Sequence, residues 1–556
     1  MSARPLLDCD MDSTIRRVHL LWYTRYTPTV KLGKTTLTGR DITGLGLDFF
    51  GGILFAEPPV GKLRLKPTVL KKELDVKTFD ASNFGLSCLS SDASPPLASE
   101  DCLTINVYRP TGVKSKSKLP VIIFRDTLIW DFSYGGGFHN GVSSIYNTSA
   151  IVVTSVARGT PVIYVSFNYR LEPLGFPQGK EADKRGILNL AIKDQLAALH
   201  WVQENIETFG GDKKRVAAFG QSAGAIMTAI LFLDSTIEKL ARAAIFESGS
   251  AASALTFNAE RRQVDWQNFV SAVPACASRA LSDNTLDCLR QANTTEINAG
   301  LRFAIASAPE TYGFDPTIDG AGGLYPDFAS NLFARGKFAK LPFIAGTNLD
   351  EGTLFTNLAV NDVNVLRQSI MANFSPPTVS TQSLSDAADD LLRLYPAGDP
   401  TGGSPFNTGN ETFGLSPVFK TAAAIQGDVS FHSQRRLWIQ TAAKAGVKTY
   451  GYLFTEPTPG AGPYGVVHGS EVLFIYGAPS NPTAEAAYLS QMMINYWVSF
   501  ATSLGPNDGK GVLRPNWPQY TTNNQVLLEL NGANTTVIPD TYRKEQIDYI
   551  NSIPLV

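Results

Sequence analysis

The chain has 556 residues, of which 44% are hydrophobic and 18% are charged, with a formal net charge of −2. This balance gives no electrostatic footprint for nucleic acid or for an anionic membrane surface. The longest apolar stretch, near residues 223–233, is far shorter than the roughly 20 residues that span a bilayer. We therefore expect a globular protein with neither a nucleic-acid partner nor a transmembrane segment.

The first 28 residues form an atypical N-terminal segment. Residues 1–26 carry scattered charges and lack the continuous apolar run, followed by small residues, that a secretory signal peptide needs. Two hypotheses are open: the protein stays inside the cell, or this segment is a mispredicted start. We favour the second. No linker, charge block or internal repeat divides the remainder, so we expect residues 29–556 to form a single domain.

Six short apolar runs alternate with stretches of helical periodicity. They cover residues 121–124, 162–166, 216–219, 244–246, 343–345 and 450–454. This alternation predicts an α/β protein with a large, mostly parallel, twisted central sheet flanked by helices. Apolar residues at helical spacing between 188 and 206 predict a helix against that sheet. Residues 353–443, rich in Ser, Thr, Asn, Pro and Gly, predict helical and loop insertions outside it.

The segment 219–224, Phe-Gly-Gln-Ser-Ala-Gly, joins one of these runs to an apolar stretch of helical character. A serine at this place predicts a nucleophile elbow, a sharp strand-to-helix turn that exposes the hydroxyl group of Ser222. The backbone packs so closely in such a turn that side chains at Gly220 and Gly224 would collide. An ordinary glycine-serine turn is the alternative, because the motif alone is weakly specific.

A serine hydroxyl needs a base to take its proton and an acid to orient that base. Of the five histidines, His468 follows the run 450–454 in a glycine-flanked loop, where such sheets place their chemistry. His200 lies on the predicted helix, and we interpret it as a packed or surface residue. Asp350 and Glu351 follow the run 343–345, and both are candidates for the acid.

The glycine run 135–137 is a candidate oxyanion site. Its backbone N–H groups, together with the N–H of Ala223, are suited to bind a developing negative charge. A plain flexible loop is the alternative, since glycine clusters usually mark turns.

Four of the five cysteines form two close pairs, Cys88 with Cys102 and Cys276 with Cys288. The partners enclose only 13 and 11 residues, which favours two local disulfides and an oxidising compartment. Buried free thiols are the alternative. N-glycosylation sequons give weak further support for secretion; they begin at Asn147, Asn293, Asn373, Asn410 and Asn534.

Together these motifs resemble the type-B carboxylesterases, the family of cholinesterase-like α/β hydrolases that includes a fungal lipase and sterol-esterase branch. The resemblance extends from about residue 29 to about residue 520. It rests on segments in the order of the family: 49–61, 99–107, 135–138, 168–170, 175–176, 209–212, 220–225, 347–352, 468–471 and 517–520.

The resemblance implies the α/β-hydrolase fold and a secreted glycoprotein that hydrolyses a small-molecule or lipid carboxylic ester through an acyl-enzyme, without metal or organic cofactor. It implies Ser222 as the nucleophile, His468 as the base and Glu351, rather than Asp350, as the acid. The implied oxyanion donors are Gly136, Gly137 and Ala223. It also implies the disulfides Cys88–Cys102 and Cys276–Cys288, which leave Cys9 over.

Buried charges elsewhere in the family motifs have a structural interpretation. Glu100 and Arg170 must be paired if they are buried, and neither needs a catalytic role.

The chain departs from the family pattern at two places. Residues 125–133 add about eight residues before the glycine run, and we interpret them as an error of gene-model splicing rather than an evolved loop. The loop between Cys88 and Cys102 is much shorter than the lid of lipase-like members and offers only Leu89 and Leu97 as large apolar residues. It predicts a permanently open site.

Two alternatives remain at the level of function. A catalytically inactive relative that serves in adhesion or binding is the competing class, but such relatives usually lack a triad residue, and all three are present here. Triacylglycerols, sterol esters, aryl esters and short acetate esters are all open as the natural substrate.

Overall fold

The computed structural model describes residues 26–125, 136–145, 147–254, 257–308, 313–373, 380–480 and 483–553. Residues 1–25, which include Cys9 and most of the atypical N-terminal segment, lie outside these ranges. Residues 126–135, which contain nearly all of the predicted insertion and Gly135, lie outside them too.

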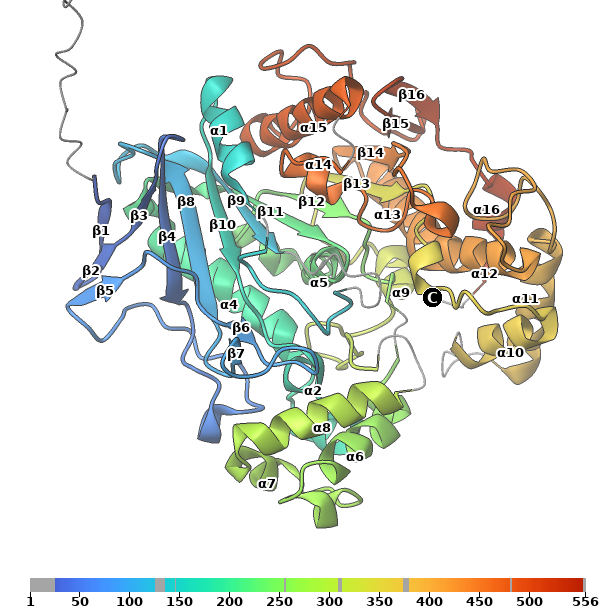
Figure 1. The fold of residues 1–556 in the computed structure, drawn as a ribbon, viewed down its shortest axis with the longest axis horizontal. Helices are drawn as coiled ribbons and strands as arrows, with labels where there is room; N and C mark the ends of the chain where they lie inside the picture. Colours follow the sequence, from blue (N-terminus) through green and yellow to red (C-terminus); the bar gives the residue numbers. More distant parts are fainter. Residues whose placement is uncertain are drawn as a thin grey trace, which may run out of the picture.

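An 11-stranded sheet forms the central layer (Figure 1), in the order β16-β15-β14-β13-β12-β11-β9-β10-β8-β4-β3. The strands are β3 Arg40–Ile42, β4 Leu47–Leu54, β8 Thr104–Pro110, β9 Leu119–Arg125, β10 Ile163–Phe167, β11 Gly211–Gln221, β12 Ala243–Glu247, β13 Phe343–Asn348, β14 Thr449–Phe454, β15 Val526–Leu530 and β16 Thr536–Pro539. The six predicted apolar runs fall in β9 to β14.

The sheet is parallel in its middle and antiparallel at its edges. Neighbouring strands from β10 to β15 pair in parallel. The pairs β10 with β8, β8 with β4, β4 with β3 and β15 with β16 are antiparallel. The mostly parallel sheet is therefore confirmed, and the antiparallel edges are an addition to the prediction.

Alternate residues of the central strands enter two separate apolar cores, because successive side chains of a strand point to opposite faces. Val121 and Ile123 face α4 (Leu190–Asn205), α5 (Ala223–Leu231) and α13 (Ser433–Lys444). Ile122 and Phe124 face α1 (Ser149–Ala157), α14 (Val472–Ile475) and α15 (Ala484–Ser503). Helices on both faces explain why these strands are continuously apolar.

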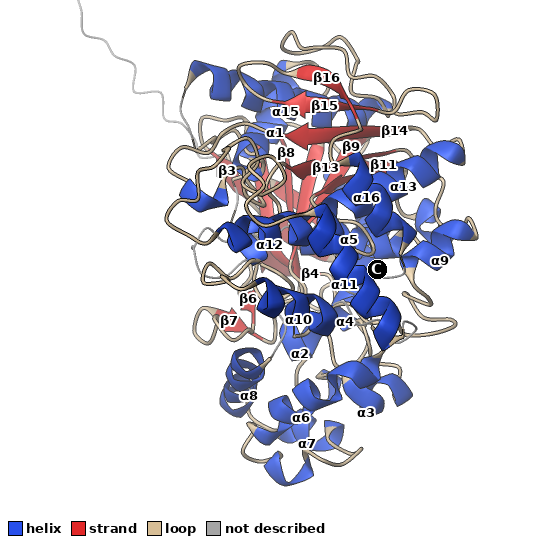
Figure 2. Cartoon of the chain, turned by 90° about the vertical axis from the view of Figure 1, so that its right-hand side faces the viewer, coloured by secondary structure: helices blue, strands red, loops and turns tan. Residues whose placement is uncertain are grey.

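Further helices lie outside the two layers (Figures 1 and 2). One group at the bottom of Figure 1 comprises α6 (Gln263–Ser271), α7 (Leu286–Gln291) and α8 (Thr294–Ser307). A second group surrounds a third apolar core and comprises α10 (Val363–Asn373), α11 (Thr381–Leu394), α12 (Pro417–Gly427) and α16 (Lys544–Ser552). The predicted helical insertions within residues 353–443 are thus confirmed. The remaining described helices are α2 (Glu172–Gly175), α3 (Gly179–Lys184) and α9 (Ala329–Ala334).

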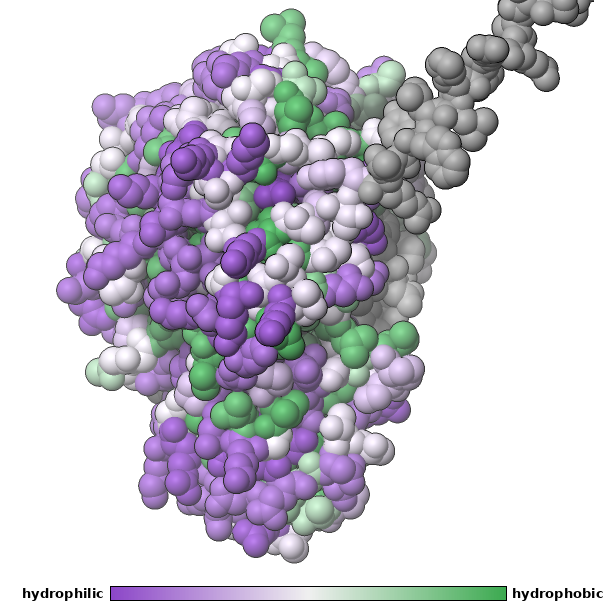
Figure 3. Space-filling model, turned by 90° about the vertical axis from the view of Figure 1, so that its left-hand side faces the viewer, coloured by the Kyte–Doolittle hydropathy of each residue, from purple (hydrophilic) through white to green (hydrophobic). Residues whose placement is uncertain are grey.

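Smaller sheets complete the N-terminal part. The first contains β1 (Thr29–Leu32), β2 (Thr35–Thr38) and β5 (Thr78–Asp80), and the second pairs β6 (Ser87–Cys88) with β7 (Ala98–Ser99). On the face shown in Figure 3, hydrophilic residues predominate and hydrophobic ones are scattered among them. Within the described residues, no helix has the length and apolar character needed to cross a membrane.

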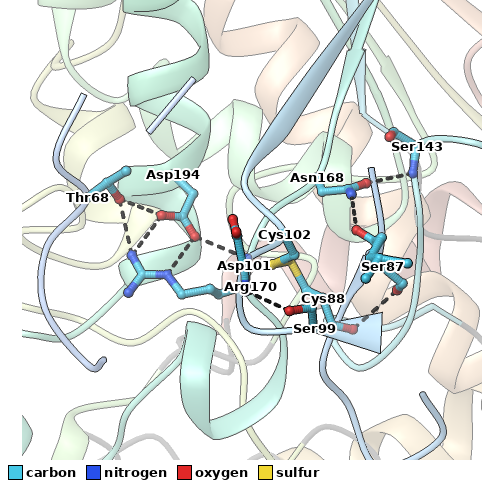
Figure 4. The surroundings of a disulfide bond; sticks show 11 residues. Thr68, Ser87, Cys88, Ser99, Asp101, Cys102, Ser143, Asn168, Arg170 and Asp194 are labelled. Atoms are coloured by element: carbon cyan, nitrogen blue, oxygen red, sulfur yellow. Dashed lines mark hydrogen bonds and ion pairs between the residues drawn. A yellow bond between two sulfur atoms is a disulfide. The ribbon is translucent and has the colours of Figure 1, made fainter. Parts of the chain in front are cut away.

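Both expected disulfides, Cys88–Cys102 and Cys276–Cys288, are present. Figure 4 shows the first of them beside Asn168 and Arg170. The guanidinium of Arg170 donates to both carboxylate oxygens of Asp194, at 2.7 and 2.9 Å.

Glu100 is paired in the same way. Its two carboxylate oxygens accept from the guanidinium of Arg64 at 2.5 and 2.6 Å. Both predicted buried charges therefore have the partners that burial demands.

Candidate active site

Ser222 lies in the turn between β11 and α5 with φ 53° and ψ −128°, a strained conformation for a residue with a side chain. Its N–H donates to the carbonyl of Glu247 at 2.9 Å. A Cβ atom on Gly220 would lie 2.5 Å from the carbonyl carbon of Gly224, so no larger residue fits there. This is the sharp strand-to-helix turn that the sequence predicts.

His468 lies between Ser222 and Glu351. Its Nε2 is 2.8 Å from the Oγ of Ser222, and its Nδ1 is 2.5 Å from Oε2 of Glu351. All three side chains are buried. They come from the loops after β14, β11 and β13, whose carboxyl ends lie at the same edge of the parallel sheet. This shared edge explains how residues more than 100 positions apart meet.

The carboxylate of Glu351 is fixed on its other side as well. Its Oε1 accepts from the backbone N–H of Asn348 at 2.7 Å and from the hydroxyl of Ser248 at 2.6 Å. These two donors leave Oε2 directed at the imidazole of His468. This arrangement suits the tautomer of His468 that has its proton on Nδ1 and presents Nε2 to Ser222 as an acceptor.

Asp350, the rival carboxylate, has different partners. It accepts from the hydroxyl of Ser404 at 2.8 Å and from the backbone N–H groups of Phe406 and Val466 at 2.8 and 2.9 Å. Burial raises the pKa of Asp350 to about 6. The side chain therefore fastens the loop that carries His468 to the segment around Phe406, and it does not face the imidazole.

A second buried carboxylate, that of Glu471, lies next to Glu351. Its Oε2 accepts from the side-chain amide of Asn348 at 2.5 Å, and the hydroxyl of Ser248 is 3.4 Å from its Oε1. Burial, together with the neighbouring charge of Glu351, raises the pKa of Glu471. Glu471 is not among the site residues expected from the sequence, although its position three residues after His468 was a usable signal.

Two aromatic rings pack on the imidazole. The ring centroids of Phe355 and Phe431 lie 5.0 and 4.8 Å from that of His468, and 5.5 Å from each other. Phe431 belongs to a π-helical turn, Asp428–His432, which widens the helix between α12 and α13. Such turns often occur at functional sites, where they redirect a side chain. Neither phenylalanine carried a signal in the sequence.

A cavity of about 280 Å³ opens next to Phe355. Its walls come from α10, α12 and the segment that joins β13 to α10. The lining mixes apolar and polar side chains, among them Val360, Leu366, Ile370, Ala422, Asn357 and Gln426.

The glycine turn, residues 136–140, is the described part of the glycine-rich segment. The N–H groups of His139 and Asn140 donate to the carbonyl of Gly136 at 2.7 and 2.9 Å. Gly137 has a φ of 37° and Phe138 a φ of 69°, so the chain reverses within two residues. Ala223, the third candidate donor, is the first residue of α5.

The sequence profile described as "Carboxylesterase family" matches residues 27–550. Secreted lipase 1 of Botryotinia fuckeliana (strain B05.10) is 34% identical over 94% of this chain and 92% of its own. Lipase 2 of Geotrichum candidum is 31% identical over 90% of this chain and 91% of its own. Both alignments extend over nearly the whole of each chain.

Solved structures agree with these sequence matches. The crystal structure of Aspergillus niger EstA superposes with a TM-score of 0.79 at 26% identity, covering 95% of this chain and 98% of the other. The fold also matches that of a PNB esterase, with a TM-score of 0.73 at 24% identity, covering 93% and 99%.

Fold, profile and relatives together define a carboxylic ester hydrolase with the α/β-hydrolase fold. The chain belongs to the carboxylesterase family, with fungal lipases among its relatives. The family, the fold and the class of reaction expected from the sequence are thereby confirmed.

Proposed function

We propose that the protein hydrolyses carboxylic esters through a covalent acyl-enzyme on Ser222, with His468 as the base and Glu351 as the acid that orients it. The observation that carries this proposal is the pair of hydrogen bonds that His468 makes, through Nδ1 with Glu351 at 2.5 Å and through Nε2 with Ser222 at 2.8 Å. Two buried donors on the other carboxylate oxygen of Glu351, the hydroxyl of Ser248 and the N–H of Asn348, give further support.

In the first half of the reaction, Nε2 of His468 takes the proton of the Ser222 hydroxyl as Oγ attacks the carbonyl carbon of the ester. The carbonyl π bond opens, and its electron pair moves to the oxygen. The negative carboxylate of Glu351 stabilises the imidazolium that forms. As the tetrahedral intermediate collapses, the bond to the alkoxide breaks, and the alkoxide receives the proton from His468.

In the second half, water attacks the acyl-enzyme and His468 takes its proton. Collapse of the second intermediate breaks the bond to Oγ, returns the proton to Ser222 and releases the acid. We assign the backbone N–H groups of Gly136, Gly137 and Ala223 to the oxyanion of both intermediates. Loss of one such donor typically costs about 10² to 10³ in kcat.

The cavity next to Phe355 supports a role in binding the apolar part of the ester, since Phe355 also contacts the ring of His468. A volume of about 280 Å³ suits an acyl chain longer than acetyl. We expect Ala422→Leu, which fills this cavity, to lower kcat/KM for p-nitrophenyl octanoate but not for p-nitrophenyl acetate. An equal effect on the two esters would place the acyl chain elsewhere.

We also infer that the protein acts outside the cell. Two disulfides favour an oxidising compartment, and the name of one relative, Secreted lipase 1, agrees with export. The sequons expected to carry glycans include Asn293, which lies at the start of α8.

Rapid mixing with p-nitrophenyl butyrate tests the acyl-enzyme. We expect a burst of about one p-nitrophenol per active site when deacylation is the slower step, and stoichiometric labelling of Ser222 by a p-nitrophenyl phosphonate, located by peptide mass. Ser222→Ala should abolish both while leaving the thermal midpoint close to that of the wild type. Turnover by Ser222→Ala within tenfold of wild type would overturn the mechanism, and a folded wild type without turnover would favour a binding role.

A further inference from the structure

Glu172, the first residue of α2, combines two unfavourable features. Its backbone has a φ of 52°, a left-handed conformation that residues with side chains rarely adopt. Its side chain is fully buried, and within the described ranges no lysine, arginine or histidine forms an ion pair with it. Burial, with a smaller contribution from Asp92, raises the pKa of Glu172 to about 8. Stability alone therefore does not explain a glutamate at this position.

The side chain of Glu172 holds the disulfide loop, residues 88–102. Its carboxylate accepts from the backbone N–H of Ser91 at 2.9 and 3.0 Å and from the Ser91 hydroxyl at 2.6 Å. Helix α8 fastens the same point of the loop from another side. Asn298 donates to the carbonyl of Ser90 at 3.0 Å, and Arg302 donates to that of Ser91 at 3.2 Å.

The backbone of Glu172 holds the glycine turn. Its N–H donates to the carbonyl of Phe138 at 3.1 Å, directly after Gly137. A second contact joins the loop to the turn, because the side-chain amide of Asn140 donates to Asp92 at 3.1 Å. The edge-to-face packing of Phe138 on Phe176, with centroids 5.3 Å apart, secures the turn to the end of α2.

We propose that Glu172 is a positioning residue for ester hydrolysis. It ties the disulfide loop to the glycine turn, and thereby keeps the N–H groups of Gly136 and Gly137 directed at the reacting carbonyl oxygen. This inference rests on the proposed role of those two glycines. It also keeps the disulfide loop in a fixed position beside the turn, because α2 and α8 hold the loop at Ser90 and Ser91.

Glu181 provides a matched control. This glutamate is also buried, and its carboxylate accepts from the backbone N–H and the hydroxyl of Thr285 at 2.8 and 2.6 Å, with a longer contact from the N–H of Leu286 at 3.4 Å. It lies in α3 and fastens the start of α7, away from the glycine turn. Replacing Glu172 and replacing Glu181 remove the same kind of contact, but only the first contact reaches the turn.

The test compares Glu172→Leu, Glu172→Gln and Glu181→Leu in the full chain with p-nitrophenyl acetate. Active sites are counted by phosphonate labelling of Ser222, so kcat refers to folded, competent enzyme. For Glu172→Leu we expect kcat per labelled site to fall at least tenfold and KM to change less than threefold. Glu172→Gln should restore most of kcat, because its amide oxygen still accepts from Ser91. Glu181→Leu should lower the thermal midpoint and leave kcat per labelled site unchanged.

Wild-type kcat per labelled site in Glu172→Leu would overturn the proposal, as would equal losses in Glu172→Leu and Glu181→Leu. A failure of the proposed function is distinguishable from these outcomes, since the phosphonate would then label the wild type at a residue other than Ser222.

Discussion

The two sides of the active site are held in different ways. On the side of the proposed acid, here called the acid side, Glu351 interlocks through hydrogen bonds with buried residues at the ends of β12 and β13 and after β14, namely Ser248, Asn348 and Glu471. On the oxyanion side, the glycine turn is a loop fastened by other loops, through Glu172 and Asp92. The acid side is thus anchored directly to the central sheet, whereas the oxyanion side depends on contacts that a single substitution can break.

Replacement of Glu351, the proposed acid, should produce the largest loss of activity. We expect Glu351→Gln to lower kcat by about 10³ to 10⁴, because an amide does not stabilise the imidazolium and favours the wrong tautomer of His468. Asp350→Asn should cost less than tenfold, since Asp350 contacts Ser404, Phe406 and Val466 and not the imidazole. Steady-state kinetics on p-nitrophenyl acetate measure both. The reverse ranking would identify Asp350 as the acid.

On the oxyanion side, activity should depend on the length of the segment that precedes the glycine turn, residues 125–133. Deleting about eight residues within 125–133 restores the spacing of the family, and we expect it to raise both soluble yield and kcat, since one oxyanion donor is worth roughly 10² in kcat. Steady-state kinetics on p-nitrophenyl acetate, expressed per site labelled at Ser222, measure the change. If the shortened form is less active than the parent, residues 125–133 are a genuine feature of the protein.

The acid side should also carry a pH signature in stability. Burial raises the pKa of Asp350 from 3.8 to about 6, so the folded state binds a proton that the unfolded state has released in this range. Asp350 therefore favours folding below pH 3.8, and this contribution is lost as the pH rises to about 6. As the pH rises from 3.8 to about 6, the unfolding free energy of the wild type should therefore fall relative to that of Asp350→Asn. Urea titration of both proteins at several pH values measures this change. A difference in unfolding free energy that does not change with pH would contradict the raised pKa of Asp350.

The smallest effect is expected when the disulfide loop, residues 88–102, meets a lipid surface. Because Ser90 and Ser91 are fastened by Glu172, Asn298 and Arg302, the loop should not move when a lipid surface appears. The rate of tributyrin hydrolysis should therefore rise smoothly as the substrate passes its solubility limit, with measurable activity below it. A sharp increase at the first emulsion, with little activity before it, would place a mobile lid elsewhere, most directly within residues 353–443.

The amino-acid sequence determined the parts of this protein that depend on nearby residues. The strand-to-helix turn at Ser222 follows from Gly220, whose neighbours leave no space for a Cβ atom. The six central strands follow from short, continuously apolar runs, because a sheet covered on both faces has no polar side. The family motifs added the order of the chemical groups along the chain and the pairing of the cysteines.

Only the tertiary structure decided which distant groups meet. Asp350 and Glu351 are adjacent in the sequence, and the residues alone left both open as the acid; the packing of β13 against β14 turned one carboxylate to His468 and the other to Val466. Phe355 and Phe431 reach the imidazole through a helical turn and a π-helical turn that no pattern marked. The contact between Glu172 and Ser91 spans 81 positions. Such contacts depend on how whole layers pack, and no local propensity encodes them.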